Sequence, residues 1–136
     1  MIYDGTHLKG FESHTEKVID IQPGIGGLSN AQFDTPWPKL RNLKNRFKKS
    51  LQSDRADEIH LLDLLRNDSV APDEELPSTG LSLERERELS ACFIKTSDYG
   101  TRTSSLIEFK NRQVKFVEQG YNTLGPTELI KFSFQF

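Results

Sequence analysis

The chain has 136 residues, of which 35% are hydrophobic and 28% charged, and its formal net charge is −2. This composition is typical of one soluble globular domain, and a net charge so near zero gives no global attraction to nucleic acid or an anionic membrane. No apolar run reaches the roughly 20 residues that cross a bilayer, and the N-terminal sequence lacks the basic and apolar regions of a signal peptide. The single cysteine, Cys92, excludes an intrachain disulfide and fits a reducing compartment, so we expect a cytoplasmic protein.

The first part of the chain predicts three strands and a helix. Asp4-Gly5 lies between two short β-prone runs and predicts a hairpin turn. The run KVIDIQ, residues 17–22, predicts a third strand that ends at PGIGG. Thr35 then predicts the N-cap of a helix over 36–51, with Pro36 at its first position. The apolar side chains of this helix form a stripe about 120° wide, which indicates a core-facing helix; they are Trp37, Leu40, Leu43, Phe47 and Leu51.

The second part predicts a shorter helix, a loop and three strands. Ile59, Leu62 and Leu65 share one face of a helix over 57–67. Residues 68–80 have the composition of a loop, and 81–90 predict a short helical turn. Strands over 104–109, 113–119 and 128–136 are expected to form an antiparallel meander. We expect the apolar face of the last strand to pack against the helix over 36–51 or against a facing sheet; this face carries Ile130, Phe132, Phe134 and Phe136.

Three stretches, GGLSNAQFDTPWPKL, ELPSTGLSLERE and FIKTSDYGTRTSSLIEF followed by VKFVEQGYN, resemble the later half of the NRDE family, which includes the transport and Golgi organization 2 proteins. The resemblance runs through nearly all of the chain in the family's order. Members of the family begin with Met-Cys and carry an early Asn-Arg-Asp-Glu quartet, and neither occurs here. We therefore expect residues 1–136 to be the C-terminal portion of a single NRDE-family domain. The turn at Asn111-Arg112 also departs from the family's Asp-Gly-like turn and should place Arg112 at positive φ.

The resemblance implies an α+β fold that is part of an αββα sandwich like that of the N-terminal-nucleophile hydrolases, with mainly antiparallel strands and two main helices. It also implies site residues. Asn30 resembles the asparagine that donates to the developing oxyanion in related acylases, and Arg102 resembles a late arginine placed beside the nucleophile. The neighbouring candidates for substrate binding are Ser29, Trp37, Tyr99 and Thr101.

Each of these residues also has a purely structural interpretation. The Asn30 side chain can satisfy backbone groups in the turn before the helix, and Arg102 can form a salt bridge with Asp98 or Glu108. The glycines at 24, 26 and 27 lack a phosphate-binding signature and are interpreted as turn residues. His7, His14 and His60 lack metal-ligand spacing, so no metal site is expected, and Cys92 is interpreted as a small core residue.

Residues 39–49 carry a basic cluster on the predicted amphipathic helix, with no acidic residue between Asp34 and Asp54. Such a helix could lie on an anionic membrane. Packing of its narrow apolar stripe in the core is favoured over membrane contact, because the acidic stretch from Asp54 to Glu75 can neutralise the cluster. Nucleic-acid binding is not expected, since no aromatic residues are arranged as stacking platforms.

Three classes of function follow from the resemblance. The first is transport or chaperone-type handling of a small-molecule or lipid-like ligand, with haem as a transported ligand and no cofactor of the chain's own. The second is cleavage of a non-peptide amide or thioester by a full-length relative, whose terminal cysteine attacks while Asn30 holds the oxyanion. The third is an inactive or structural fragment. The chain alone lacks the terminal nucleophile and should be inactive, and it should self-associate or bind its N-terminal half through uncovered strand edges and apolar surface.

Overall fold

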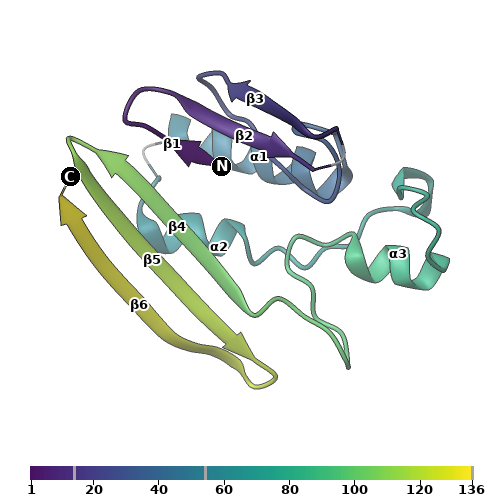
Figure 1. The fold of residues 1–136 in the computed structure, drawn as a ribbon. Helices are drawn as coiled ribbons and strands as arrows, with labels where there is room; N and C mark the ends of the chain where they lie inside the picture. The colour runs from purple at the N-terminus through teal and green to yellow at the C-terminus, as the bar shows by residue number, and fades with distance from the viewer. Residues whose placement is uncertain (14, 54, 136) are drawn as a thin grey trace.

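The computed structural model describes residues 1–13, 15–53 and 55–135. It confirms an α+β fold with two antiparallel three-stranded sheets, one from each end of the sequence, and with the helices between them in chain order (Figure 1). The first sheet has the order β1-β2-β3 and the second the order β4-β5-β6. The elements in chain order are β1 (Ile2–Tyr3), β2 (Leu8–Glu12), β3 (Lys17–Ile21), α1 (Pro38–Gln52), α2 (Glu58–Leu64), the 3-10 helix η1 (Asp73–Glu75), α3 (Leu83–Leu89), β4 (Thr103–Lys110), β5 (Gln113–Asn122) and β6 (Gly125–Gln135).

The predicted hairpin at the start of the chain is confirmed by the pairing of β1 with β2. The Asp4 carboxylate accepts hydrogen bonds from the backbone N–H groups of Thr6 and His7, at 2.8 and 2.7 Å. Gly5 has φ of 98°, a conformation that glycine adopts without a Cβ clash. The chain therefore reverses at the residues that the sequence indicated, and β3 then pairs with β2 as expected.

The helix α1 begins two residues later than predicted, and the assignment of Thr35 as its N-cap was wrong. Trp37 occupies the N-cap position without a side-chain hydrogen bond, and Pro38 begins the helix. The reason is a turn just before the helix, in which the Trp37 N–H donates to the Thr35 carbonyl at 2.8 Å. Of the predicted apolar stripe, Leu40 is buried, whereas Leu51 at the far end is 47% exposed.

The second helix is shorter than predicted, and the structure changes which of its side chains are buried. Asp57 caps α2 by accepting from the His60 N–H, and Leu62 is buried as expected. Ile59 is 72% exposed, however, so its assignment to the packed face was wrong. The predicted loop contains the 3-10 turn η1, and the predicted helical turn is α3, which Ser82 caps by accepting from the Arg85 N–H.

The C-terminal meander is confirmed, with strands longer than predicted. The turn between β4 and β5 places Asn111 at φ 50° and Arg112 at φ 59°, as the sequence indicated for Arg112. Pairing of β5 with β6 is continuous except for an irregularity between Gln119 and Tyr121. This bulge turns the end of β5, and the Tyr121 N–H donates to the Arg102 carbonyl at 2.8 Å.

The helices cover the opposite face of the second sheet from the one we expected. Val117, in the centre of β5, is fully buried, and Glu58 of α2 forms ion pairs with Lys115 and Lys131 on the same face as Val117. The alternation along the strands places Phe116 on the other face, which is paired with Phe132 of β6.

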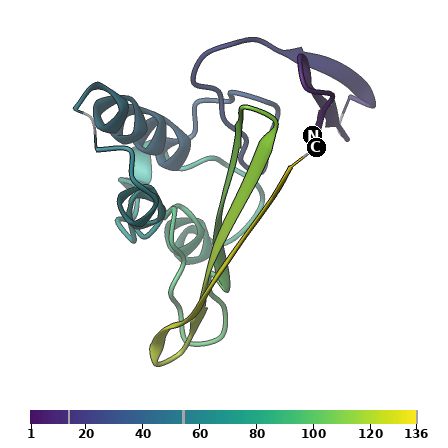
Figure 2. The ribbon, with the colours of Figure 1, turned by 90° about the vertical axis from the view of Figure 1, so that its left-hand side faces the viewer.

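We expected the phenylalanine face of β6 to pack against the helix over 36–51 or against a facing sheet; the helix was wrong, and the facing β1–β3 sheet covers this face only in part. Phe132 and Phe134 are each 52% exposed, and Ile130 is 46% exposed. Figure 2 shows the helices on one side of the β4–β6 sheet and the β1–β3 sheet on the other side, near the chain termini. Tyr3 reaches Phe109 at 5.0 Å between ring centroids, which covers one end of the face. Phe136, the last residue of the predicted face, lies outside the described residues.

Candidate functional site

Arg102, Tyr99 and Thr101 line one cavity of about 840 Å³, between the segment after α3 and the turn that joins β5 to β6. Backbone hydrogen bonds fix its walls. The Phe93 N–H donates to the Asn67 carbonyl at 2.8 Å, which attaches this segment to the end of α2. Lys95 and Gly100 form an antiparallel bridge, so the lining residues between them are held in a tight hairpin. The cavity is thus built from three segments that are distant in the sequence.

The Arg102 side chain is exposed, and within the described parts of the chain no acidic group is paired with it. Asp98, one of the acids that we considered as its structural partner, lies 3.6 Å from Arg85 and accepts from the Thr96 hydroxyl. These contacts hold the pKa of Asp98 below its usual value, with the Thr96 hydroxyl as the largest cause. The guanidinium of Arg102 is therefore available to an anionic ligand.

Tyr99 and Thr101 have structural contacts in the wall of this cavity. The Thr101 hydroxyl accepts from the Ile94 N–H, and the Thr101 N–H donates to the Ile94 carbonyl, both at 2.9 Å. The Tyr99 ring is 54% exposed and lies 5.4 Å from the Arg85 guanidinium, a cation–π distance. Thr101 thus shapes the cavity, whereas Tyr99 presents an aromatic surface at its edge.

Asn30 lies at an exposed bend between β3 and α1. The side chain that closes this bend is that of Asp34, which accepts from the Gly27 N–H at 2.8 Å and pairs with Lys44 at 2.8 Å. These contacts lower the pKa of Asp34, and the hydrogen bond from Lys44 is the largest cause. Asp34 thus makes the contacts that close this bend, and both interpretations of Asn30 stay predictions.

Two of the three glycines before Asn30, Gly26 and Gly27, are required by close packing. A Cβ atom at Gly26 would lie 2.4 Å from the Phe33 ring, and one at Gly27 would lie 2.3 Å from Leu40 of α1. Both distances are too short for real Cβ contacts, so a side chain at either position would displace its neighbour. This supports their interpretation as backbone residues of a turn.

The structure does not bring all of the predicted site residues together. Ser29, Asn30 and Trp37 are not among the residues that line the Arg102 cavity. Ser29 is half-buried beside Asn30, and Trp37 lies at the start of α1 with the Lys39 ammonium 5.8 Å from its ring. The roles of Asn30 as an oxyanion donor and of Trp37 as a ligand contact stay predictions.

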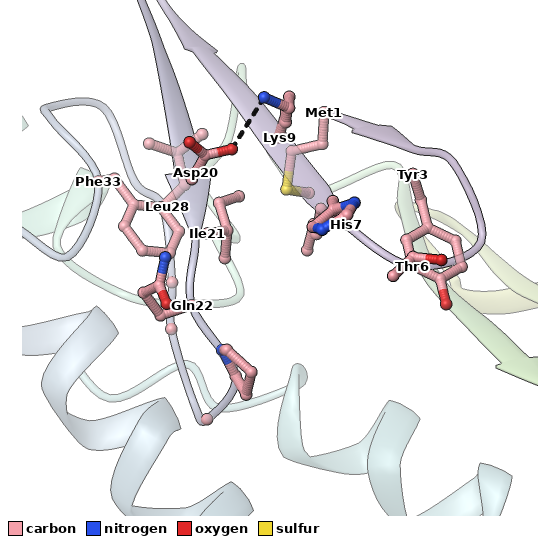
Figure 3. Close-up of a pocket in the computed structure, with 15 residues that line it drawn as sticks. Met1, Tyr3, Thr6, His7, Lys9, Asp20, Ile21, Gln22, Leu28 and Phe33 are labelled. Atoms are coloured by element: carbon pink, nitrogen blue, oxygen red, sulfur yellow. Dashed lines mark ion pairs between the residues drawn. The ribbon is translucent and has the colours of Figure 1, made fainter.

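A second cavity, of about 810 Å³, lies against the first sheet (Figure 3). Met1 and His7 come from the β1–β2 hairpin, and Leu28 and Phe33 line the wall formed by the segment after β3. The charged side chains of its strands, Lys9 and Asp20, pair with each other at 3.0 Å. Because this pair is satisfied internally, we favour the Arg102 cavity as the candidate site.

Cys92 is half-buried, and this burial raises the pKa of its thiol despite the nearby cations Lys39 and Arg46. Burial also lowers the pKa of Lys39, whose ammonium donates to the Leu89 carbonyl at 2.9 Å. A thiol with a raised pKa is largely protonated at neutral pH and is a poor nucleophile. The structure therefore favours the interpretation of Cys92 as a packing residue.

The basic helix α1 is tied to the rest of the chain through several of its cations. Arg41 pairs with Glu75 of η1, and Arg46 donates to the Leu64 carbonyl at 3.1 Å. These contacts support packing against the protein over membrane contact. In the part of the chain that the structure describes, no helix is both long and apolar enough to cross a membrane. Among the same residues, no group of three or more potential ligands is arranged to hold a metal ion.

The residues that line the Arg102 cavity and were not singled out by the sequence include Arg66, Phe93 and Tyr121. The Phe93 and Tyr121 rings meet edge to face at 4.8 Å. Arg66 follows the end of α2, and the run VEQGYN that contains Tyr121 carried the family resemblance without marking a site. Only the pairing of distant segments places these side chains beside Arg102.

Comparisons with known proteins agree with the family resemblance of the sequence. The sequence model of the family described as Transport and Golgi organisation 2 matches residues 3–123. A Transport and Golgi organization protein 2 homolog of Bos taurus is 35% identical over 127 residues, which cover 87% of this chain and 46% of the relative. A Transport and Golgi organization 2 homolog of Mus musculus is 33% identical over 110 residues, covering 74% of this chain and 40% of the relative.

The α+β chain thus belongs to a class of proteins named for transport and organisation of the Golgi. In particular, it belongs to the Transport and Golgi organisation 2 family. The chain spans less than half of the length of the two relatives described above.

Proposed function

We propose that this chain contributes a ligand-binding surface to a cytoplasmic transport or chaperone-type protein, which handles a small apolar or lipid-like ligand such as haem. The observation that carries the proposal is the cavity at Arg102. Its volume of about 840 Å³ lies within the range of small-molecule sites, and it combines aromatic walls with a guanidinium that no acidic side chain of the described residues neutralises. Such a site suits a ligand with an apolar body and an acidic group.

Titration of the chain with haemin and with a fatty acid tests this proposal. The expected result is saturable binding with a shift of the haem absorption band or displacement of a fluorescent fatty acid. Arg102→Gln should weaken the binding by about tenfold, because a charge-assisted hydrogen bond contributes about 1.5–3 kcal/mol. Arg55→Gln, at an exposed arginine outside this cavity, is the matched control. Absence of saturable binding of either ligand would contradict the carrier function.

A second candidate function, amide or thioester hydrolysis by a full-length relative, is supported by Asn30. Asn30 is exposed at the bend, whereas the Asp34 side chain makes the hydrogen bond that closes the turn. A preorganised amide donor contributes about 10²–10³-fold to the turnover of acyl-transfer enzymes. Substitution of the equivalent asparagine in a relative that begins with Met-Cys should therefore lower kcat by that factor with little change in KM. If substitution of the preceding serine lowered kcat by the same factor, the loss would point to a folding defect and not to a missing oxyanion donor.

The apolar sheet face supports a further part of the proposal, which concerns the partner of the chain. We propose that a polypeptide corresponding to the unmatched part of the relatives packs on the face formed by β4, β5 and β6. The matched part makes up 46% of the bovine relative, so a segment of comparable size is present there. The exposed phenylalanines of β6 are the surface that such a segment would bury. Without it, the chain should self-associate through the same face.

A further inference from the structure

The hydroxyl of Tyr121 is the starting point for a further inference about the ligand. Tyr121 is 5% exposed, and its hydroxyl is the buried side-chain oxygen for which the described residues provide no hydrogen-bond partner. Buried polar groups in proteins are almost always paired, because an unpaired one loses its hydrogen bonds to water without replacement. An unpaired phenol in the wall of a cavity therefore requires an explanation.

Tyr121 lines two neighbouring cavities. One is the cavity at Arg102, and the other, of about 450 Å³, lies between α2 and the second sheet. Arg66 and Pro126 also line both, so these three residues form the wall where the cavities meet. An acceptor oxygen that enters at this wall would give the hydroxyl of Tyr121 the partner that it lacks.

The two cavities carry the cations Arg66, Lys95 and Arg102, and their acidic residues Asp57, Asp63 and Asp98 each have a partner within the described residues. Arg66 lies 3.9 Å from Asp63, and both side chains are about half exposed or more, at 48% and 63%. An exposed pair at this distance contributes little to stability, so the guanidinium can turn toward a ligand at small cost. Arg102 is held next to Tyr121 by the hydrogen bond from the Tyr121 N–H to the Arg102 carbonyl. Asp98, an acid in the same lining, is already paired with Arg85.

We propose that Arg66 and the Tyr121 hydroxyl complete, together with Arg102, a binding site for the acidic group of an amphiphilic ligand. The acidic group is a carboxylate or a phosphate, since both accept hydrogen bonds from guanidinium groups and from a phenol. The apolar part of the ligand lies against Phe93, Pro126 and Leu129, which line the two cavities. This inference rests on the proposed ligand-handling function and assigns the groups that anchor the ligand.

Calorimetric titration of the chain with dodecanoate, dodecyl phosphate and dodecanol tests the site. At least one of the two anions should bind about tenfold or more tightly than the uncharged alcohol, and the preferred anion identifies a carboxylate or a phosphate ligand. Arg66→Gln and Arg102→Gln should each weaken anion binding by about tenfold. Arg55→Gln, the matched control outside both cavities, should leave it unchanged.

Tyr121→Phe separates a binding role from a structural one. It should weaken anion binding by about three- to tenfold while the melting temperature of the free protein stays the same or rises, because an unpaired buried hydroxyl is removed. A lower melting temperature with unchanged affinity would assign Tyr121 to the core and overturn its part in the site.

Three further results would overturn the inference. The first is equal affinity for dodecanol and the anions, and the second is an effect of Arg66→Gln no larger than that of Arg55→Gln. The third is loss of binding in Phe132→Ser with full binding in Arg66→Gln, which would place the ligand on the exposed sheet face. If the unmodified chain binds neither these amphiphiles nor haemin, the proposed function fails as well. If the chain binds the anions but substitutions of Arg66, Arg102 and Tyr121 leave the affinity unchanged, the proposed function stands and only this site is ruled out.

Discussion

Replacement of Phe132 by serine should weaken self-association of the chain, because this side chain lies in the middle of the exposed apolar face. Phe132 is 52% exposed and stacks on Phe116 at 4.9 Å between ring centroids. A phenylalanine side chain presents about 150–250 Å², so roughly 100 Å² of Phe132 remains to be buried in a contact. At about 25 cal/mol per Å², this area contributes roughly 2.5 kcal/mol to association.

The expected change in affinity follows from this area. A loss of about 2.5 kcal/mol corresponds to a roughly 60-fold higher dissociation constant. In a symmetrical dimer both chains carry the substitution, so the dimer loses this contribution twice. Sedimentation velocity over a range of concentrations measures it. Ile59→Ser is the matched control, because Ile59 is 72% exposed on α2, away from the phenylalanine face.

Two results would refute this reasoning. One is a compact monomer at all concentrations with a sharp, concentration-independent melting transition. It would mean that the chain is stable with the phenylalanine face exposed to solvent. The other is an equal loss of association in Ile59→Ser, which would mean that association is not specific to the sheet. If the face binds the remaining segment of the relatives, adding that polypeptide should raise the melting temperature of the unmodified chain by mass action, and should do so less for Phe132→Ser.

Further predictions concern the turns and the cysteine. Asp34 has a lowered pKa in the folded chain, so its stabilising contribution should be present above its ordinary pKa of 3.8 and lost as the pH falls through the lowered value; melting temperatures of Asp34→Asn and the unmodified chain should converge at low pH. Gly27→Ala should destabilise the chain by about 1–3 kcal/mol in urea unfolding, because its Cβ would overlap Leu40. Cys92 should react slowly with iodoacetamide at pH 7, and its alkylation rate should keep rising above pH 9, the ordinary pKa of a thiol.

The sequence was sufficient for features that depend on nearby residues. The hairpin at Asp4-Gly5, the antiparallel meander and the positive φ of Arg112 follow from turn chemistry and from alternation, which act over a few residues. The position of Thr35 shows the limit of this reasoning. A threonine before Pro36 has the chemistry of an N-cap, but the turn from Thr35 to Trp37 moved the start of α1 to Pro38. Such a competing turn is decided by backbone hydrogen bonds that composition does not reveal.

The tertiary structure alone decided which faces are covered and which side chains share a site. Alternation on β6 showed that Phe132 and Phe134 share a face, but burial depends on what packs there, and the helices pack on the opposite face through Val117 and Glu58. The candidate site likewise joins Arg66, Arg102 and Tyr121, which are separated by long stretches of chain. Periodicity is a local property, whereas a site of this kind forms only when hydrogen bonds between distant segments bring its walls together.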